Sequence, residues 1–175
     1  IKKLFAMHKL EIFDVEELDT HGGSLRIFIK HKDNNLQKER KSVKKILEVE
    51  KMFGLTKIIT YTNFSREVNL IKEELLRFLI KAKKDNKVVV GYGAPAKGNT
   101  LLNFCGINFD LINYTVDINP HKQGMYLPGS HIPIRSPNEI FKTKPDYVLI
   151  LPWNLKKEIM VQMKNIRKWG GKFVI

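Results

Sequence analysis

The stretch of sequence that decides the fold reads Gly91-Tyr92-Gly93-Ala94-Pro95-Ala96-Lys97-Gly98-Asn99-Thr100. It follows the apolar run 88–90 and precedes a helix-like segment over 100–104. Glycine lets the backbone turn sharply and approach a ligand closely, and the N–H groups that begin a helix favour a bound anion. The pattern therefore predicts a strand, a glycine turn and a helix that together hold a phosphate-bearing, nucleotide-like group.

The glycine spacing fits a variant of the dinucleotide-binding motif. The third glycine is Gly98, and Ala96 takes the last position of the variant G-x-G-x-x-A. Asp117 ends the next predicted strand, 113–117, where such folds place an acidic residue against ribose hydroxyls. The alternative interpretation is a tight strand-to-helix corner that binds no ligand.

Length and composition indicate one main domain without disulfides. The chain has 175 residues, of which 43% are hydrophobic, and this is enough for one sizeable core. The longest apolar runs are only strand-sized and no basic, apolar leader is seen, so we expect a cytoplasmic protein with no membrane partner. Cys105 is the only cysteine, and the histidines lack the spacing of metal ligands, so no metal site is predicted.

The strong positive charge does not by itself indicate a nucleic-acid partner. The formal net charge is +13, but the lysines are dispersed along predicted helix faces and mixed with glutamates. No zinc finger, recognition helix or basic ribbon interleaved with aromatic residues is present. We therefore expect no nucleic-acid partner, and the charge suits an anionic small ligand.

The chain divides into three predicted regions, at 1–33, 34–86 and 87–175. Near-alternating apolar residues in the first region predict two strands, 10–16 and 24–30, joined by a polar loop. A lone hairpin is marginal in water, so we expect it to pair with a sheet outside this chain or with a second copy, giving a dimer.

Helices are predicted in the second region and alternate with strands in the third. One helix covers 34–53, and another starts near the capping candidates Thr62 and Asn63. The strands of the third region lie near 88–92, 113–117, 132–134, 147–151 and 172–175. A helix over 155–166 stops before Gly170. Right-handed crossovers then give an α/β fold with a Rossmann-like, doubly wound and mainly parallel sheet.

Ligands of such sheets gather beyond the carboxyl ends of the strands, where three loops of this chain converge. Lys97 follows the glycine turn, where a cation complements a pyrophosphate, and Trp153 either stacks on a base or sugar or covers the core. The loop 117–124 offers polar groups for hydroxyls and phosphates, or is an ordinary proline turn. The predicted contacts are Gly91, Gly93, Ala94, Lys97, Gly98, Asn99, Asp117, Asn119, Lys122, Gln123 and Trp153.

No catalytic group can be assigned from local motifs. His21 precedes two glycines and a serine in the loop between the first two strands, and histidine carries protons near neutral pH. However, no second catalytic group stands beside it in the sequence. Neither a G-x-S-x-G elbow nor an H-E-x-x-H pair occurs, which disfavours a hydrolase.

Five segments, in this order, resemble one known family across almost the whole chain. They are Asp19-Thr20-His21-Gly22-Gly23-Ser24-Leu25-Arg26, the glycine stretch continued to Asn103, Asp117-Ile118-Asn119-Pro120-His121-Lys122-Gln123-Gly124, Leu127-Pro128-Gly129 and Leu151-Pro152-Trp153-Asn154. The family is the S-adenosylmethionine-dependent C-methyltransferases that modify nucleotide-linked deoxysugars, and the resemblance is to their C-terminal domain.

The resemblance implies a division of labour. Family members carry a zinc-binding N-terminal domain, a central domain that binds S-adenosylmethionine, and this Rossmann-like domain, which helps to hold the nucleotide-sugar. Nothing here resembles the cysteine ligands, the cofactor loop or the segment with histidine and glutamate used for proton abstraction. We therefore expect a fragment of a longer enzyme that binds a nucleoside diphosphate sugar, needs neither zinc nor S-adenosylmethionine within this chain, and is inactive alone.

The resemblance also gives the hairpin a role. Methyltransferase sheets end with one parallel and one antiparallel strand, and the two strands predicted within residues 1–33 would be those two. Their connection then faces the catalytic side, so the resemblance implies substrate contacts, though not a catalytic base, for His21, Gly22, Gly23 and Ser24. The competing function is a non-enzymatic nucleotide- or coenzyme-binding Rossmann module that acts as a sensor or scaffold.

Overall fold

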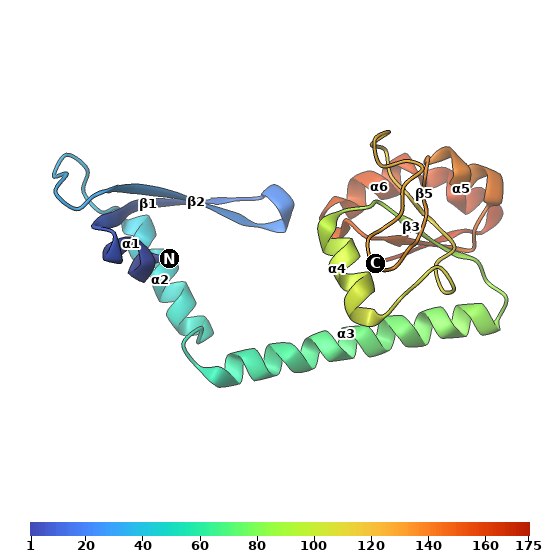
Figure 1. Cartoon of the computed structure of the whole chain (residues 1–175), viewed down its shortest axis with the longest axis horizontal. Helices are drawn as coiled ribbons and strands as arrows, with labels where there is room; N and C mark the ends of the chain where they lie inside the picture. Colours follow the sequence, from blue (N-terminus) through green and yellow to red (C-terminus); the bar gives the residue numbers. More distant parts are fainter. The chain divides into compact units, whose positions relative to one another are not determined.

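An antiparallel hairpin and a parallel sheet belong to two separate units of the chain (Figure 1). The computed structural model describes all 175 residues, and their contacts define the units as Ile1–Arg66 and Glu67–Ile175. The division falls within α3 (Ile58–Lys84), whereas the sequence predicted boundaries after residues 33 and 86. Sequence patterns mark where elements end, but units are set by which residues touch.

The first unit is built on the predicted hairpin. After the short helix α1 (Lys2–Met7), strand β1 (Leu10–Leu18) pairs with β2 (Ser24–His31), and helix α2 (Lys41–Phe53) follows. The register shifts at a bulge between Ile12 and Asp14. The hairpin confirms the two strands predicted from alternating apolar residues.

Asp14, next to the bulge, ties the hairpin to the beginning of α2. Its carboxylate accepts hydrogen bonds from the Ser42 hydroxyl at 2.6 Å and from the Val15 N–H at 2.9 Å, and it pairs with Arg40 at 2.8 Å. The Ser42 hydrogen bond, helped by Val15 and Arg40, holds the pKa of Asp14 below its ordinary value of 3.8. The folded first unit therefore favours the ionised carboxylate.

The second unit contains a five-stranded parallel sheet. Its strands are β3 (Val89–Tyr92), β4 (Thr115–Val116), β5 (Ile134–Arg135), β6 (Tyr147–Ile150) and β7 (Lys172–Val174). They lie in the order β5-β4-β3-β6-β7, and every pair is parallel. Strands β4 and β5 are added on one side of β3, and β6 and β7 are then added on its other side. This is the doubly wound arrangement, and its switch point lies between β3 and β6. This confirms the predicted fold class.

Two apolar cores cover the two faces of this sheet. One core joins the sheet to α3 and α4 (Ala96–Cys105), and its fully buried residues include Leu79 and Leu102. The other joins it to α5 (Asn138–Thr143) and α6 (Lys156–Gln162), with Ile140 and Ile159 buried. The strands of a sheet covered on both faces read as mostly apolar runs, as the central strands β3 and β6 do here.

The predicted helix starts were wrong in both helices of the region 34–86. The first helix begins at Lys41 because the Arg40 N–H donates to the Phe13 carbonyl and keeps the preceding segment beside β1. The second begins at Ile58, and the Thr62 hydroxyl donates a hydrogen bond to the Ile58 carbonyl from inside the helix, so Thr62 is not its cap.

No helix of the structure is both long enough and apolar enough to span a membrane.

The single helix predicted over 155–166 is divided in the structure. A 3₁₀ turn at Trp153–Leu155 precedes α6, and a second 3₁₀ segment, Lys164–Trp169, follows it. Gly170 ends the run in a left-handed conformation, φ +84°, which agrees with the predicted glycine stop.

We expect the variant Asp14→Asn to unfold at a lower urea concentration than the native chain at pH 7. A carboxylate with a depressed folded-state pKa stabilises the fold above its unfolded pKa, and this contribution is lost as the pH falls through the folded pKa. The difference between the two proteins should therefore shrink as the pH is lowered below about 4. Urea unfolding of both proteins, followed by circular dichroism at a series of pH values, measures this difference in stability. Asp33→Asn, at an exposed position, is the control, and equal behaviour of both variants would contradict the assignment.

Candidate functional site

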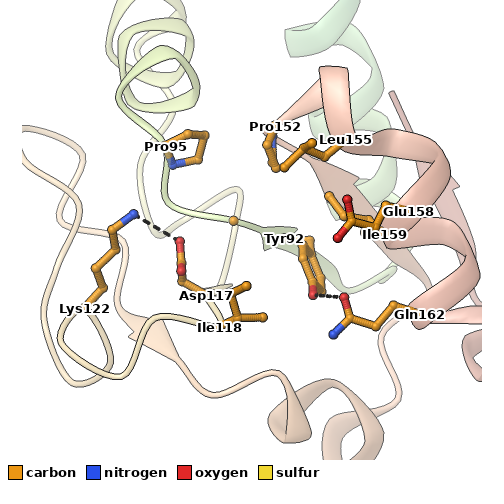
Figure 2. A pocket seen from close by; sticks show the side chains of 11 residues that line it. Tyr92, Pro95, Asp117, Ile118, Lys122, Pro152, Leu155, Glu158, Ile159 and Gln162 are labelled. Carbon is orange, nitrogen blue, oxygen red and sulfur yellow. Dashed lines mark hydrogen bonds and ion pairs between the residues drawn. The ribbon is translucent and has the colours of Figure 1, made fainter. Parts of the chain in front are cut away.

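A cavity of about 210 Å³ opens at the carboxyl ends of β3, β4 and β6 (Figure 2). This is the edge of the sheet where ligands bind in doubly wound folds. Its walls are mostly apolar, with a few polar groups among them. The lining residues are Tyr92, Gly93, Pro95, Asp117, Ile118, Lys122, Pro152, Leu155, Glu158, Ile159 and Gln162.

Gly93 forms the corner between β3 and α4 at the edge of this cavity. Its φ is +88°, a conformation that side chains rarely adopt. A Cβ atom at this position would lie 2.6 Å from Cδ of Pro152, in the loop after β6. The glycine therefore serves both the turn and the close approach of two loops that border the cavity.

Gly91 and Gly98 are required by packing inside the unit. A Cβ on Gly91 would meet Oγ1 of Thr115 on β4 at 2.7 Å. A Cβ on Gly98 would meet Cβ of Leu151 at 2.7 Å, so this glycine lets α4 lie close to the end of β6. Neither residue lines the cavity, and for these two glycines the structural interpretation of the motif accounts for the residue type.

Asp117, predicted to contact ribose hydroxyls, binds backbone N–H groups of two loops with its carboxylate. The side chain is 9% exposed, and Oδ2 accepts the Ala94 N–H at 2.8 Å while Oδ1 accepts the Asn119 N–H at 2.9 Å. Lys122 pairs with the same carboxylate at 3.3 Å and donates to the Ala94 carbonyl at 2.9 Å. The backbone N–H of Ala94 is therefore held by the protein's own carboxylate, and the substrate contact predicted for Ala94 stays a prediction. The backbone N–H of Gly93 is also paired, because it donates a hydrogen bond to the Val116 carbonyl.

The beginning of α4 still offers unpaired amides. Pro95 is the N-cap residue and no side chain caps the helix, while the first helical bond is donated by Asn99. The N–H groups of Ala96, Lys97 and Gly98 have no residue four positions earlier within the helix to accept them. They carry the positive end of the helix dipole, which favours a negative group.

Lys97 and Trp153, predicted separately, form one cluster. The Lys97 ammonium lies 4.8 Å from the centre of the Trp153 ring and donates a hydrogen bond to the Asn154 side-chain oxygen. The tryptophan is 44% exposed, so its outer face is accessible. This cluster stands beside the cavity and outside its lining.

The other predicted contacts are placed differently. Asn119 caps its own turn by accepting the His121 N–H at 3.0 Å, and Gln123 donates to the Asp117 carbonyl at 2.9 Å, so both hold the loop after β4 in shape. The Asn99 side-chain oxygen is buried without a partner. Neither Asn99 nor the two loop residues line the cavity.

The loop between β1 and β2 belongs to the first unit. His21 is exposed, with φ +57° inside a 3₁₀ turn, and Gly22 and Gly23 also have positive φ values. The Ser24 hydroxyl donates to the Thr20 carbonyl at 3.0 Å. The substrate contacts predicted for these residues stay predictions.

Three polar residues of the cavity were missed from the sequence: Tyr92, Glu158 and Gln162. Tyr92 is only 4% exposed, and its hydroxyl donates to the Gln162 side-chain oxygen at 2.9 Å (Figure 2). Burial raises the pKa of Tyr92, and the negative charges of Asp117 and Glu158 add to this, so the phenol stays neutral. The available signal was the spacing of Glu158 and Gln162, four residues apart on the helix after β6.

Two comparisons with known proteins show what this chain is similar to. Residues 19–175 match the model of a family described as the C-methyltransferase C-terminal domain. The chain is also 36% identical over 172 residues to the C-methyltransferase NovU of Streptomyces niveus. That alignment covers 98% of this chain and 41% of NovU, so the chain spans less than half the length of this relative.

We expect Gly98→Ala to lower the free energy of unfolding by about 1 kcal/mol or more, because the added methyl overlaps Leu151 and overpacking costs about 1–3 kcal/mol. The loss should appear although alanine is the better helix former. Thermal unfolding of Gly98→Ala and of the control Thr100→Ala, at an exposed helix position, measures the effect. A Gly98→Ala protein as stable as the control would show that α4 does not lie so close to the strand.

Proposed function

This chain belongs to the family of C-methyltransferase C-terminal domains, and from this premise we propose that it holds the nucleoside diphosphate sugar on which a methyltransferase acts. Membership in this family supports a role in a methyl-transfer reaction. The finer statement, that the substrate is a keto-deoxysugar linked to a nucleotide, rests on the resemblance of five segments and on the site described above.

One observation carries the proposal: the cavity borders both the glycine corner and the uncapped beginning of α4. Binding sites for drug-sized ligands usually measure about 300–1,000 Å³. A cavity of about 210 Å³ therefore takes one part of a nucleotide-sugar and leaves the rest outside. The amides of α4 and the Lys97 ammonium offer the positive groups that a diphosphate requires.

The proposed function does not require zinc or S-adenosylmethionine to bind within this chain. No group of three or more histidine, cysteine, aspartate or glutamate residues is placed to hold a metal ion. We infer that both groups bind in other parts of the complete enzyme, and that this chain alone transfers no methyl group.

The contribution of this chain to the reaction is positioning. In the complete enzyme, S-adenosylmethionine would supply the methyl group that is transferred to the sugar carbon next to the keto group. Holding the substrate in the productive geometry removes much of the entropic part of the barrier. The catalytic base is assigned to no residue of this chain.

We expect Lys97→Ala in the full-length enzyme to weaken binding of the nucleotide-sugar about tenfold or more, because a charge-assisted hydrogen bond is worth roughly 1.5–3 kcal/mol. Gly93→Val should weaken it further, since the side chain would collide with Pro152. Isothermal titration calorimetry measures both affinities.

The control is Lys84→Ala, an exposed lysine at the end of α3. Circular dichroism shows whether Gly93→Val is folded. If a folded Lys97→Ala protein binds the nucleotide-sugar with native affinity, the diphosphate does not bind beside Lys97.

A further inference from the structure

We propose that a groove on the α3 and α4 face of the parallel sheet receives an amphipathic helix from the part of the complete enzyme outside this chain. The groove measures about 730 Å³ and is lined by apolar residues apart from Glu74 and Lys156. No residue lines both this groove and the cavity at the carboxyl ends of β3 and β4. The helix can therefore dock whichever ligand the enzyme binds, and its docking is tested separately from the proposed function.

The α3 and α4 face of the sheet has room for one more helix. Neighbouring strands lie about 4.8 Å apart and packed helices lie about 8–10 Å apart, so one helix covers about two strands. The opposite face carries three helical segments, α5, α6 and Lys164–Trp169. The α3 and α4 face carries two helices on the same five strands. The groove lies beside β6 and β7, where a third helix would complete this face.

The walls of the groove have the form that accepts a helix. Ile71, Leu75 and Phe78 follow one another at steps of four and three residues, so they form one apolar ridge along α3. Leu149 on β6 and Val174 on β7 belong to the core on this face and also line the groove. A helix laid beside such a ridge packs its own apolar side chains into the spaces between these residues.

Apolar side chains of the groove are in contact with water in this chain. Ile71 is 53% exposed and Trp153 is 44% exposed. A contiguous apolar surface with charged residues at its rim marks an interaction site, and covering it is favourable because apolar area leaves the water. The apolar face of an amphipathic helix supplies this cover.

The size of the groove favours a segment of the same polypeptide over a second copy. Eleven residues line the groove, whereas a stable interface between two proteins takes about 20–30 residues from each partner. A tethered helix needs fewer contacts because the tether gives it a high effective concentration. The aligned region is 41% of NovU, so in a relative of this length most of the polypeptide lies outside the 175 residues described here.

The charged residues of the groove indicate the chemistry of the helix. Glu74 on α3 and Lys156 at the beginning of α6 are exposed, and neither forms a salt bridge within the chain. Complementary charges at the rim of an interface select the partner and its orientation. We therefore assign to the helix a lysine or arginine facing Glu74 and an aspartate or glutamate facing Lys156.

Photo-crosslinking in the full-length enzyme tests this docking. The crosslinking amino acid p-benzoylphenylalanine is placed at Ile71, which lines the groove and is exposed enough to accept it. The matched control carries it at Ile80, which is 45% exposed on the same helix and does not line the groove. After irradiation, electrophoresis separates crosslinks within one polypeptide from crosslinks between copies, and mass spectrometry identifies the joined peptides.

We expect the probe at Ile71 to join, within one polypeptide, a peptide outside these 175 residues that has apolar residues at helical spacing. The probe at Ile80 should not reach that peptide. Crosslinks between two copies, crosslinks confined to these 175 residues, the same peptide from Ile80, or no crosslink from Ile71 would each overturn the proposal.

A charge reversal tests the chemistry assigned to the helix. In the enzyme with the probe at Ile71, Glu74→Lys should lower the yield of the crosslinked peptide about threefold, because it replaces an attraction at the rim by a repulsion. Glu73→Lys is the matched control, at the neighbouring exposed glutamate, which does not line the groove. Equal yields from the two variants would contradict a basic residue facing Glu74.

Discussion

The carboxylate of Asp117 holds the candidate site together. It binds the backbone N–H that follows the glycine corner, and it pairs with Lys122 from its own loop. The loops after β3 and β4 are therefore joined by a buried charge, and removing a partner from such a charge is strongly destabilising. Because Lys122 is the only lysine or arginine that lines the cavity, its pairing with Asp117 leaves no unpaired cationic side chain in the lining.

Close packing sets the positions of the surrounding elements. The glycines of the motif differ in what they do: Gly91 and Gly98 admit a strand and a helix at short distance, and Gly93 makes the turn. Only the last of these reaches the cavity. A glycine-rich stretch therefore reports the backbone path reliably, whereas its contribution to binding depends on neighbours that come from other strands.

Much of the fold could be predicted from the sequence because its signals are local. Apolar runs bounded by glycine and proline indicated the parallel strands, and alternation indicated the hairpin. The start of α3 was misplaced because Thr62 has the side chain of a cap yet lies inside the helix. Tyr92 and Gln162 were missed because their contact joins residues 70 positions apart, which no local pattern contains. The substrate contact predicted for His21 stays a prediction, because the residue lies in the first unit and the cavity lies in the second.

The stacking of Lys97 on a half-exposed indole has an optical consequence. Trp153 and Trp169 are the two tryptophans, and the indole N–H of Trp169 is held by the Pro145 carbonyl away from the cavity. An anion that draws the ammonium off the Trp153 ring changes the electric field at that fluorophore and leaves the other untouched. The protein thus contains an intrinsic emission reporter at the edge of its candidate site.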